Sequence, residues 1–200
     1  MKLRIALILS LLTLPATVLP GYRLLYREEL YRLYHQHLYQ YSERVAENIV
    51  WLETALGADF ANPLNALAVI RNERDWERYR YLFEMQLNLL LVESYVQWAA
   101  RYTKREAYFF NAPFREQNLE SLEIAENLFE TARYYWFEAA AWSSRAADLR
   151  IVHLPEVENW ADRSHRIETR QLDYGRIIDR HLARIEEVRR AFLAMDDSTY

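Results

Sequence analysis

Apolar side chains recur every seven residues between positions 122 and 146, and small and large residues alternate in this repeat. Apolar residues three and four positions apart are typical of a helix packed in a left-handed coiled-coil geometry. An alanine at one core position lets a neighbouring helix come close, and large side chains fill the space on either side. The sequence therefore predicts a central packing helix. Its alanines are Ala125, Ala132, Ala139 and Ala146, and its large residues are Leu122, Phe129 and Trp136 with Leu128, Tyr135 and Trp142.

The same spacing predicts three more long helices. The first covers residues 22–56 and stops at Gly57, with an eleven-residue rhythm of apolar positions that suits a nearly straight helix. The second covers residues 75–109, and its LNLLLV run predicts the most buried helix of the fold. The repeat helix ends near Leu149, and the fourth helix covers residues 155–195.

The connectors between these helices are short. Asn62 and Pro63 form a helix entry, with asparagine as the cap and proline in the first turn, so we expect a brief helix over residues 64–71. Short connectors make sequential helices antiparallel neighbours. The predicted fold is all-α: one domain over residues 22–200, an elongated antiparallel bundle of four long helices.

Composition supports this fold class. The chain of 200 residues has only 3 glycines and 5 prolines, fewer turn formers than a sheet protein of this length needs. Hydrophobic residues make up 52% of the chain, which is enough for a sizeable core.

The first twenty residues have the layout of an export signal. Basic MKLR precedes the apolar run Ile5–Leu19, whose 15 residues fall short of the roughly 20 that span a bilayer comfortably. Residues 1–21 are thus predicted to be a signal peptide, cut after Ala16 or Gly21, or an uncleaved membrane anchor. Either alternative sends the rest of the chain out of the cytoplasm, so we expect an exported, periplasmic protein.

Charge and cysteine content exclude several classes of protein. A net charge of −4, with both signs well mixed, argues against a nucleic-acid partner, which usually requires a basic stripe. The chain has no cysteine, so disulfides, thiolate metal sites and cysteine nucleophiles are absent.

No motif nominates a metal, a cofactor or a catalytic group. A di-iron bundle needs paired Glu-x-x-His motifs; the nearest spacing here is Asp162 with His165, beside arginines. His35 and His37 lie two positions apart and cannot chelate one ion from a helix. We therefore expect no metal, no cofactor and no enzymatic activity.

Polar residues on the apolar stripe of the fourth helix have a structural interpretation. His181 fits a core-edge side chain bonded to a neighbouring helix, with a ligand or pH-switch role as the alternative. Ser164 and Gln171 fit the buried polar positions that fix register in a coiled-coil seam.

Six tyrosines crowd the start of the first predicted helix, and they cannot all face one stripe. Tyr34 and Tyr41 belong to the inward set, whereas Tyr31 and Tyr39 point elsewhere. Exposed tyrosine beside arginine is typical of protein interfaces, although half-exposed rings with wet hydroxyls explain the pattern equally well. If the leader is not cleaved, Tyr22 and Tyr26 would instead lie at the membrane interface. The candidate protein-interaction residues are Tyr22, Tyr26, Tyr31 and Tyr39.

Two segments resemble known families. The stretch LEIAENLFETARYYWFEAAAWSSRA, residues 122–146, resembles one helix pair of a tetratricopeptide-type array. Residues 105–140, REAYFFNAPFREQNLESLEIAENLFETARYYWFEAA, resemble small exported helical proteins of spirochaetes, some of them collar components of periplasmic flagellar motors. The second resemblance implies a scaffold role in a periplasmic assembly and assigns no functional residue.

The sequence thus favours an exported, non-catalytic helical scaffold that binds other proteins, or itself, through the tyrosine and arginine faces of the first helix or an exposed side of the third. A competing hypothesis is a small-molecule binder or enzyme with an aromatic-lined pocket between helices. A third is attachment to the membrane through Ile5–Leu19 as the main role. An apolar pocket with convergent polar groups would favour the binder. A filled core with exposed aromatic residues would favour the scaffold.

Overall fold

The computed structural model describes residues 26–104 and 112–196. The described residues form six α-helices and no β-strand, which confirms the all-α fold class. In chain order the helices are α2 (Arg27–Gln40), α3 (Val45–Gly57), α4 (Glu73–Ala100), α5 (Arg115–Asp148), α6 (Glu158–Glu168) and α7 (Tyr174–Leu193).

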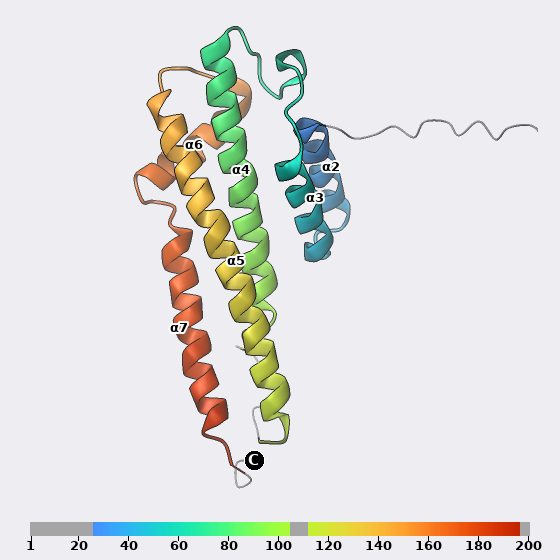
Figure 1. The fold of residues 1–200 in the computed structure, drawn as a ribbon, viewed down its shortest axis with the longest axis vertical. Coiled ribbons are helices and arrows are strands. Elements are labelled where there is room, and N and C mark those ends of the chain that lie inside the picture. The colour runs from blue at the N-terminus through green and yellow to red at the C-terminus, as the bar shows by residue number, and fades with distance from the viewer. Residues whose placement is uncertain (1–25, 105–111, 197–200) are drawn as a thin grey trace, which may run out of the picture.

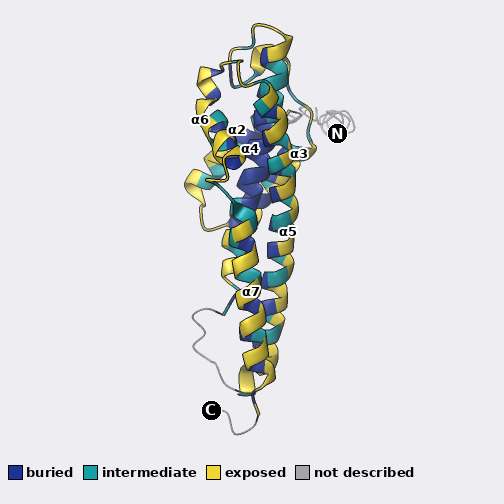
Figure 2. Ribbon diagram, turned by 90° about the vertical axis from the view of Figure 1, so that its left-hand side faces the viewer, coloured by how far each residue is buried: buried dark blue, intermediate teal, exposed yellow. Residues whose placement is uncertain are grey.

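The helices form an elongated antiparallel bundle. α4, α5 and α7 run along its long axis, and the α2–α3 pair lies beside α4 (Figure 1). α6 lies at the end of the molecule where α4 begins and packs on both α4 and α5. α7 packs mainly on α5 (Figure 1), and its first residue, Tyr174, also reaches Glu93 of α4. The core is therefore thickest around α4, where Figure 2 shows the buried residues gathered.

α5 carries the predicted seven-residue repeat on its buried face. The four alanines are at most 2% exposed, and Leu122 and Phe129 are fully buried. Ser143 continues the large-residue position and is fully buried as well. Its hydroxyl lies 2.8 Å from the Ser164 hydroxyl on α6. This pair confirms the structural interpretation of Ser164, because each hydroxyl supplies the partner that burial requires.

α4 is the most buried helix, as the LNLLLV run predicts. Met85, Leu87, Leu89 and Leu91 have no exposed surface, because α5 covers one side of the helix and the α2–α3 pair covers another. Asn72 caps its first turn by accepting a hydrogen bond from the Asp75 amide at 3.0 Å. The sequence predicts that this helix continues to residue 109, but in the structure α4 ends at Ala100. Residues 105–111 lie outside the described ranges.

A single helix over residues 22–56 is wrong. The chain turns back at Tyr41–Arg44, so that α2 and α3 form an antiparallel hairpin. No glycine or proline marks this turn, and the apolar spacing continues through it. The hairpin buries apolar residues from both of its helices against α4, which one straight helix of that length could not do. These residues include Leu30, Tyr34, Ile49 and Leu52.

The connector of residues 58–72 contains less helix than the sequence predicts. Only Pro63–Asn65 forms a single 3₁₀ turn, in place of a helix over residues 64–71. The predicted cap is confirmed, because the Asn62 side chain accepts a hydrogen bond from the Leu64 amide at 3.0 Å. We call residues 58–72 the α3–α4 connector below.

A fourth helix over residues 155–195 is also wrong. α6 ends at Glu168, and α7 begins only at Tyr174. Arg170, in the break, has a φ of 58°, the left-handed conformation that ends many helices. The amide of Leu172 closes the turn by donating to the Arg166 carbonyl at 2.9 Å. Gln171 is consequently exposed in this break and does not belong to the buried seam. In residues 26–104 and 112–196 the bundle thus has six helices in place of four long ones, because two of the predicted helices are each divided in two.

None of the helices in residues 26–104 and 112–196 combines the length and apolar character of a membrane span. The apolar run Ile5–Leu19, predicted as a signal or anchor, lies outside the described residues.

Candidate interaction surface

Arg27, the first residue of α2, bonds the α2–α3 hairpin to the rest of the bundle. The Arg27 guanidinium donates to the carbonyls of Leu56 and Ala58 at 2.7 and 3.1 Å. It also forms an ion pair with Glu84 on α4 and lies 4.3 Å from the centre of the Phe60 ring. Arg27 is only 8% exposed, so these partners replace the water that a buried cation loses.

Glu28 fastens the α3–α4 connector in the same region. Its carboxylate, 1% exposed, accepts hydrogen bonds from the Ala61 amide at 2.9 Å and the Tyr79 hydroxyl at 3.2 Å. The Tyr79 oxygen in turn accepts from the Leu67 amide at 3.1 Å. These bonds hold the connector backbone at two points, so its conformation is fixed by buried groups.

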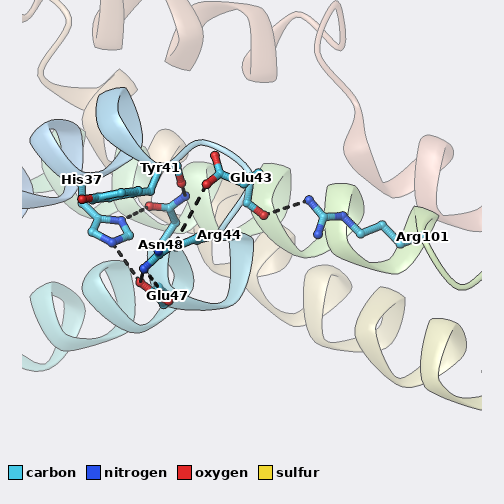
Figure 3. A network of polar contacts seen from close by, with 7 residues as sticks. All are labelled: His37, Tyr41, Glu43, Arg44, Glu47, Asn48 and Arg101. Carbon is cyan, nitrogen blue, oxygen red and sulfur yellow. Dashed lines mark hydrogen bonds and ion pairs between the residues drawn. The ribbon is translucent and has the colours of Figure 1, made fainter.

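At the other end of the hairpin, polar contacts hold the turn between α2 and α3 (Figure 3). The Asn48 amide nitrogen donates to the Tyr41 carbonyl at 3.3 Å, so its oxygen accepts from Nδ1 of His37 at 2.7 Å. Nε2 of His37 lies 3.1 Å from a Glu47 carboxylate oxygen. This explains how a turn without glycine or proline is held: side chains from both helices satisfy its polar groups.

The same turn also contacts α4. Arg101, just after α4, donates to the Glu43 carbonyl at 3.1 Å. The Arg44 guanidinium covers the Tyr41 ring at 4.5 Å from its centre (Figure 3). All these groups have partners within the chain, so the network is a structural one.

A second polar cluster joins α4 to α6 and α7. Glu93 forms an ion pair with Arg163 and accepts a hydrogen bond from the Tyr174 hydroxyl at 3.2 Å. Arg163 also donates to the Gln86 side chain at 3.2 Å. Burial, together with the Glu93 carboxylate, raises the pKa of Tyr174 to about 12. This cluster fixes where α7 starts relative to α4.

Three helices meet at one carboxylate oxygen on the side of the bundle. Glu53 on α3 accepts hydrogen bonds from the Tyr95 hydroxyl of α4 at 2.8 Å and the Tyr135 hydroxyl of α5 at 3.0 Å. The two rings stack with their centroids 5.7 Å apart. Burial and the Glu53 carboxylate raise the pKa of both tyrosines. We call these three residues the tyrosine clamp.

Next to the tyrosine clamp, α5 presents a continuous exposed stripe. Its members recur at steps of three and four, on the side of α5 away from the alanines, and all are exposed. Two large aromatic residues stand in the middle of the stripe: Tyr134 is 61% and Phe137 is 63% exposed. Tyr134 also meets Tyr135 of the clamp edge-on, with 5.3 Å between ring centroids. The stripe, called the α5 outer stripe below, consists of Glu123, Asn127, Glu130, Tyr134, Phe137, Ala141 and Ser144.

The tyrosines predicted as interaction residues differ in how far they are exposed. Tyr39 is 93% and Tyr26 is 40% exposed, and Tyr22 lies outside the described residues. Tyr31 is 8% exposed, so its expected place on the surface is wrong. Its ring packs edge-on against Trp160 at 5.6 Å between centroids, because α2 is covered by α6 as well as by α4.

Of the two tyrosines that the sequence predicts to face the core, one is buried and the other is exposed. Tyr34 is buried at 3% exposure, and burial raises its pKa to about 12. Tyr41 is 38% exposed, because it belongs to the hairpin turn and not to a helix. The aromatic pair Tyr134 and Phe137 was not singled out in the sequence, although the 3–4 spacing opposite the alanines places both on the outer side of α5.

No metal-binding group emerges in the part of the chain that the structure describes: no three His, Cys, Asp or Glu side chains there come together around one point. His181 lies at the edge of the core and stacks on Phe129 of α5 at 4.7 Å between centroids, in agreement with a structural role.

The grooves beside α5 and α7 are open features of the surface. One of about 570 Å³ runs between α5 and α7. It is lined by Glu116, Leu119, Glu120, Glu123, Glu126, Arg189 and Leu193, and Arg189 already pairs with Glu126 and Glu186. Another of about 280 Å³ lies beside Trp136 at the break between α6 and α7. Neither encloses a set of convergent polar groups around an apolar interior.

Together these features define a helical bundle whose polar networks are structural and whose most exposed aromatic side chains, Tyr39, Phe137 and Tyr134, lie near the end of α2 and on α5. The model of one family, a domain of unknown function (DUF8513), matches residues 74–195. Because this match covers more than half of the chain, the protein belongs to that family. The match includes α4 to α7 almost completely and leaves the α2–α3 hairpin outside. No curated protein and no solved structure matches the chain.

Proposed function

We propose that this protein is an exported helical scaffold that binds other proteins, or a second copy of itself, within an envelope-associated assembly. The observation that carries the proposal is the α5 outer stripe, where Tyr134 and Phe137 are 61% and 63% exposed on a rigid helix. Aromatic residues on a rigid element bind with little loss of side-chain entropy and dominate many protein interfaces.

The rigidity of this surface has a definite origin. The buried side of α5 is fixed by its alanine repeat, and its flank is fixed by the tyrosine clamp through Glu53. A binding surface built on such a helix is held in one geometry before a partner arrives, which lowers the cost of association.

Export and an envelope location rest on the leader, residues 1–21, and on the resemblance of residues 105–140 to spirochaete periplasmic proteins. The collar of a periplasmic flagellar motor is the kind of assembly that this resemblance suggests. The competing binder or enzyme gains no support from the grooves beside α5 and α7, because neither encloses convergent polar groups around an apolar interior.

Crosslinking in the native envelope tests the proposal. The chain with Tyr134→Ser and Phe137→Ser is compared with a matched control, Glu123→Ser and Asn127→Ser, which changes polar positions of the same stripe. We expect the unaltered protein and the control to crosslink to the same defined partner, and the aromatic double variant to lose it while melting at the same temperature. If all three chains capture the same neighbours, the α5 outer stripe is not the interface. If a metabolite co-purifies with the protein and no partner does, the scaffold proposal itself is wrong.

A further inference from the structure

The α3–α4 connector exposes aliphatic side chains on a backbone that is held in place. Leu64 is 91% and Val69 is 54% exposed. The Glu28 carboxylate and the Tyr79 hydroxyl hold the amides of Ala61 and Leu67, one on each side of Leu64. Leu64 is therefore presented to the outside by a fixed turn.

The connector is also free of charge over an unusual length. Residues 60–70 contain no charged side chain, in a chain of which 27% is charged. Charges of both signs stand at its borders, Asp59 before it and Arg71 after it, and the exposed Arg32 lies across the adjoining groove of about 320 Å³ with Glu28 and Glu29. An uncharged aliphatic tip with guanidinium groups beside it suits the interface of a lipid bilayer, where apolar side chains enter the acyl region and arginines meet phosphates.

The path of the chain places this tip near the predicted anchor. The described chain begins at Tyr26, whose backbone pairs with Asp59 of the connector. Tyr26 lines the same groove as Leu64. Only seven steps separate Leu19, the end of the apolar run, from Tyr26, and an extended chain of seven residues spans about 25 Å at most. A membrane that holds Ile5–Leu19 therefore lies within about 25 Å of Tyr26.

We propose that the α3–α4 connector rests on the membrane surface, with Leu64 and Val69 inserted among the lipids next to the N-terminal anchor. This inference rests on the proposed export through residues 1–21, in the alternative in which this leader stays as an uncleaved anchor. The leader and the connector then form two contacts with one bilayer. The end of α7 lies at the opposite end of the molecule from the connector (Figure 1), so in this arrangement it is remote from the bilayer.

The absence of cysteine in the chain gives a direct test. Leu64→Cys, Val69→Cys and Leu193→Cys are made separately in the full chain and labelled with an environment-sensitive fluorophore. Leu193 is the matched control, an exposed leucine at the far end of α7, with 61% of its surface accessible. Each protein is reconstituted into vesicles of phosphatidylethanolamine and phosphatidylglycerol, with and without brominated acyl chains.

We expect all three proteins to float with the vesicles. The probes at positions 64 and 69 should shift to the blue and be quenched by brominated lipid, whereas the probe at position 193 should show neither effect. A chain that floats while the probe at position 64 behaves like that at position 193 overturns this inference and leaves the anchor intact. A chain that does not float overturns both the anchor and the inference. A blue shift without vesicles that grows with protein concentration also overturns it, because a second copy then covers the connector.

Discussion

Arg27, the first residue of α2, pairs with Glu84 in the middle of α4, although 57 positions separate them in the sequence. Their side chains are 9% and 15% exposed, so the pair lies inside the bundle. Because the same guanidinium also binds two carbonyls at the end of α3, this residue joins three helices. The α2–α3 hairpin lies outside the family-matched region, and Arg27 is a principal reason that it stays on the bundle.

Replacing this arginine should weaken the fold considerably. Arg27→Met leaves Glu84 buried without its cation and two carbonyls without their donor, so we expect a loss of about 3–5 kcal/mol in the free energy of unfolding. Chemical denaturation measures it. Arg44→Met is the control, since the Arg44 side chain is 50% exposed and its ion pair with Glu47 lies on the surface. That change should cost about 1 kcal/mol or less. Equal losses would mean that Arg27 contributes no more than a surface arginine.

The alanine face of α5 should reject a larger side chain. Ala132→Leu adds volume to a position with no exposed surface, so we expect a cost of about 1–3 kcal/mol from overpacking. Ala141→Leu makes the same change on the α5 outer stripe and should alter stability by about 0.5 kcal/mol or less. Thermal unfolding of the two variants distinguishes them, and a stable Ala132→Leu protein would show that the helix contact has room to spare.

We expect that position 175 requires glycine, because the indole of Trp136 packs closely against it. A Cβ atom at Gly175, in the first turn of α7, would lie 2.9 Å from Nε1 of Trp136, whereas one at Gly57 would meet nothing within 4 Å. Gly57→Ala should therefore gain about 0.5–1 kcal/mol from the lower entropy of the unfolded chain. Gly175→Ala should lose this gain, or become destabilising, because the indole must move. If the two melting temperatures rise equally, the indole of Trp136 adapts without cost.

Stability should fall at alkaline pH. Burial raises the pKa of Tyr34 and of Tyr174 to about 12, above the value of about 10 for an exposed tyrosine. Below pH about 10 both states are protonated, and the full stability is present. As the pH rises from about 10 to about 12, the unfolded chain ionises first, and the folded state loses this advantage.

Melting temperatures measured over that range test the expectation. Tyr34→Phe and Tyr174→Phe should each make the decline less steep, because each removes one group that ionises more easily in the unfolded chain. Tyr39→Phe, at a position that is 93% exposed, serves as the control. An identical pH profile for Tyr34→Phe and the unaltered protein would show that Tyr34 does not contribute to the loss of stability at alkaline pH.

The long helices could be predicted where one face of a continuous helix is buried. α5 is such a helix, and its seven-residue repeat marks the buried alanines directly. The two missed breaks have a common reason. Neither Tyr41–Arg44 nor Thr169–Asp173 contains glycine or proline, and Arg170 adopts a left-handed φ that glycine or asparagine usually takes. The apolar spacing continues across both breaks, so periodicity alone reads each pair as one helix.

The candidate surface was harder to foresee than the core. Tyr31 was expected outside because one long helix offers one buried face, whereas the shorter α2 is covered by both α4 and α6. The tyrosine clamp depends on Glu53 meeting Tyr95 and Tyr135, which are 42 and 82 positions away. No local pattern relates residues at such distances. Tyr134 and Phe137, by contrast, follow from the spacing of α5 once its buried side is known.

The uneven thickness of the bundle has a consequence for its motions. α4 is enclosed by α2, α3, α5 and α6, whereas α7 packs on α5 with only four buried residues, Ile178, Ile185, Val188 and Phe192. Amide protons exchange with solvent through local openings, and helices with few buried contacts open at lower cost. Deuterium should therefore enter the last turns of α7 first and the middle of α4 last. Local unfolding thus begins at the end of α7, whereas the part of the bundle that carries the α2–α3 hairpin opens only when the whole protein unfolds.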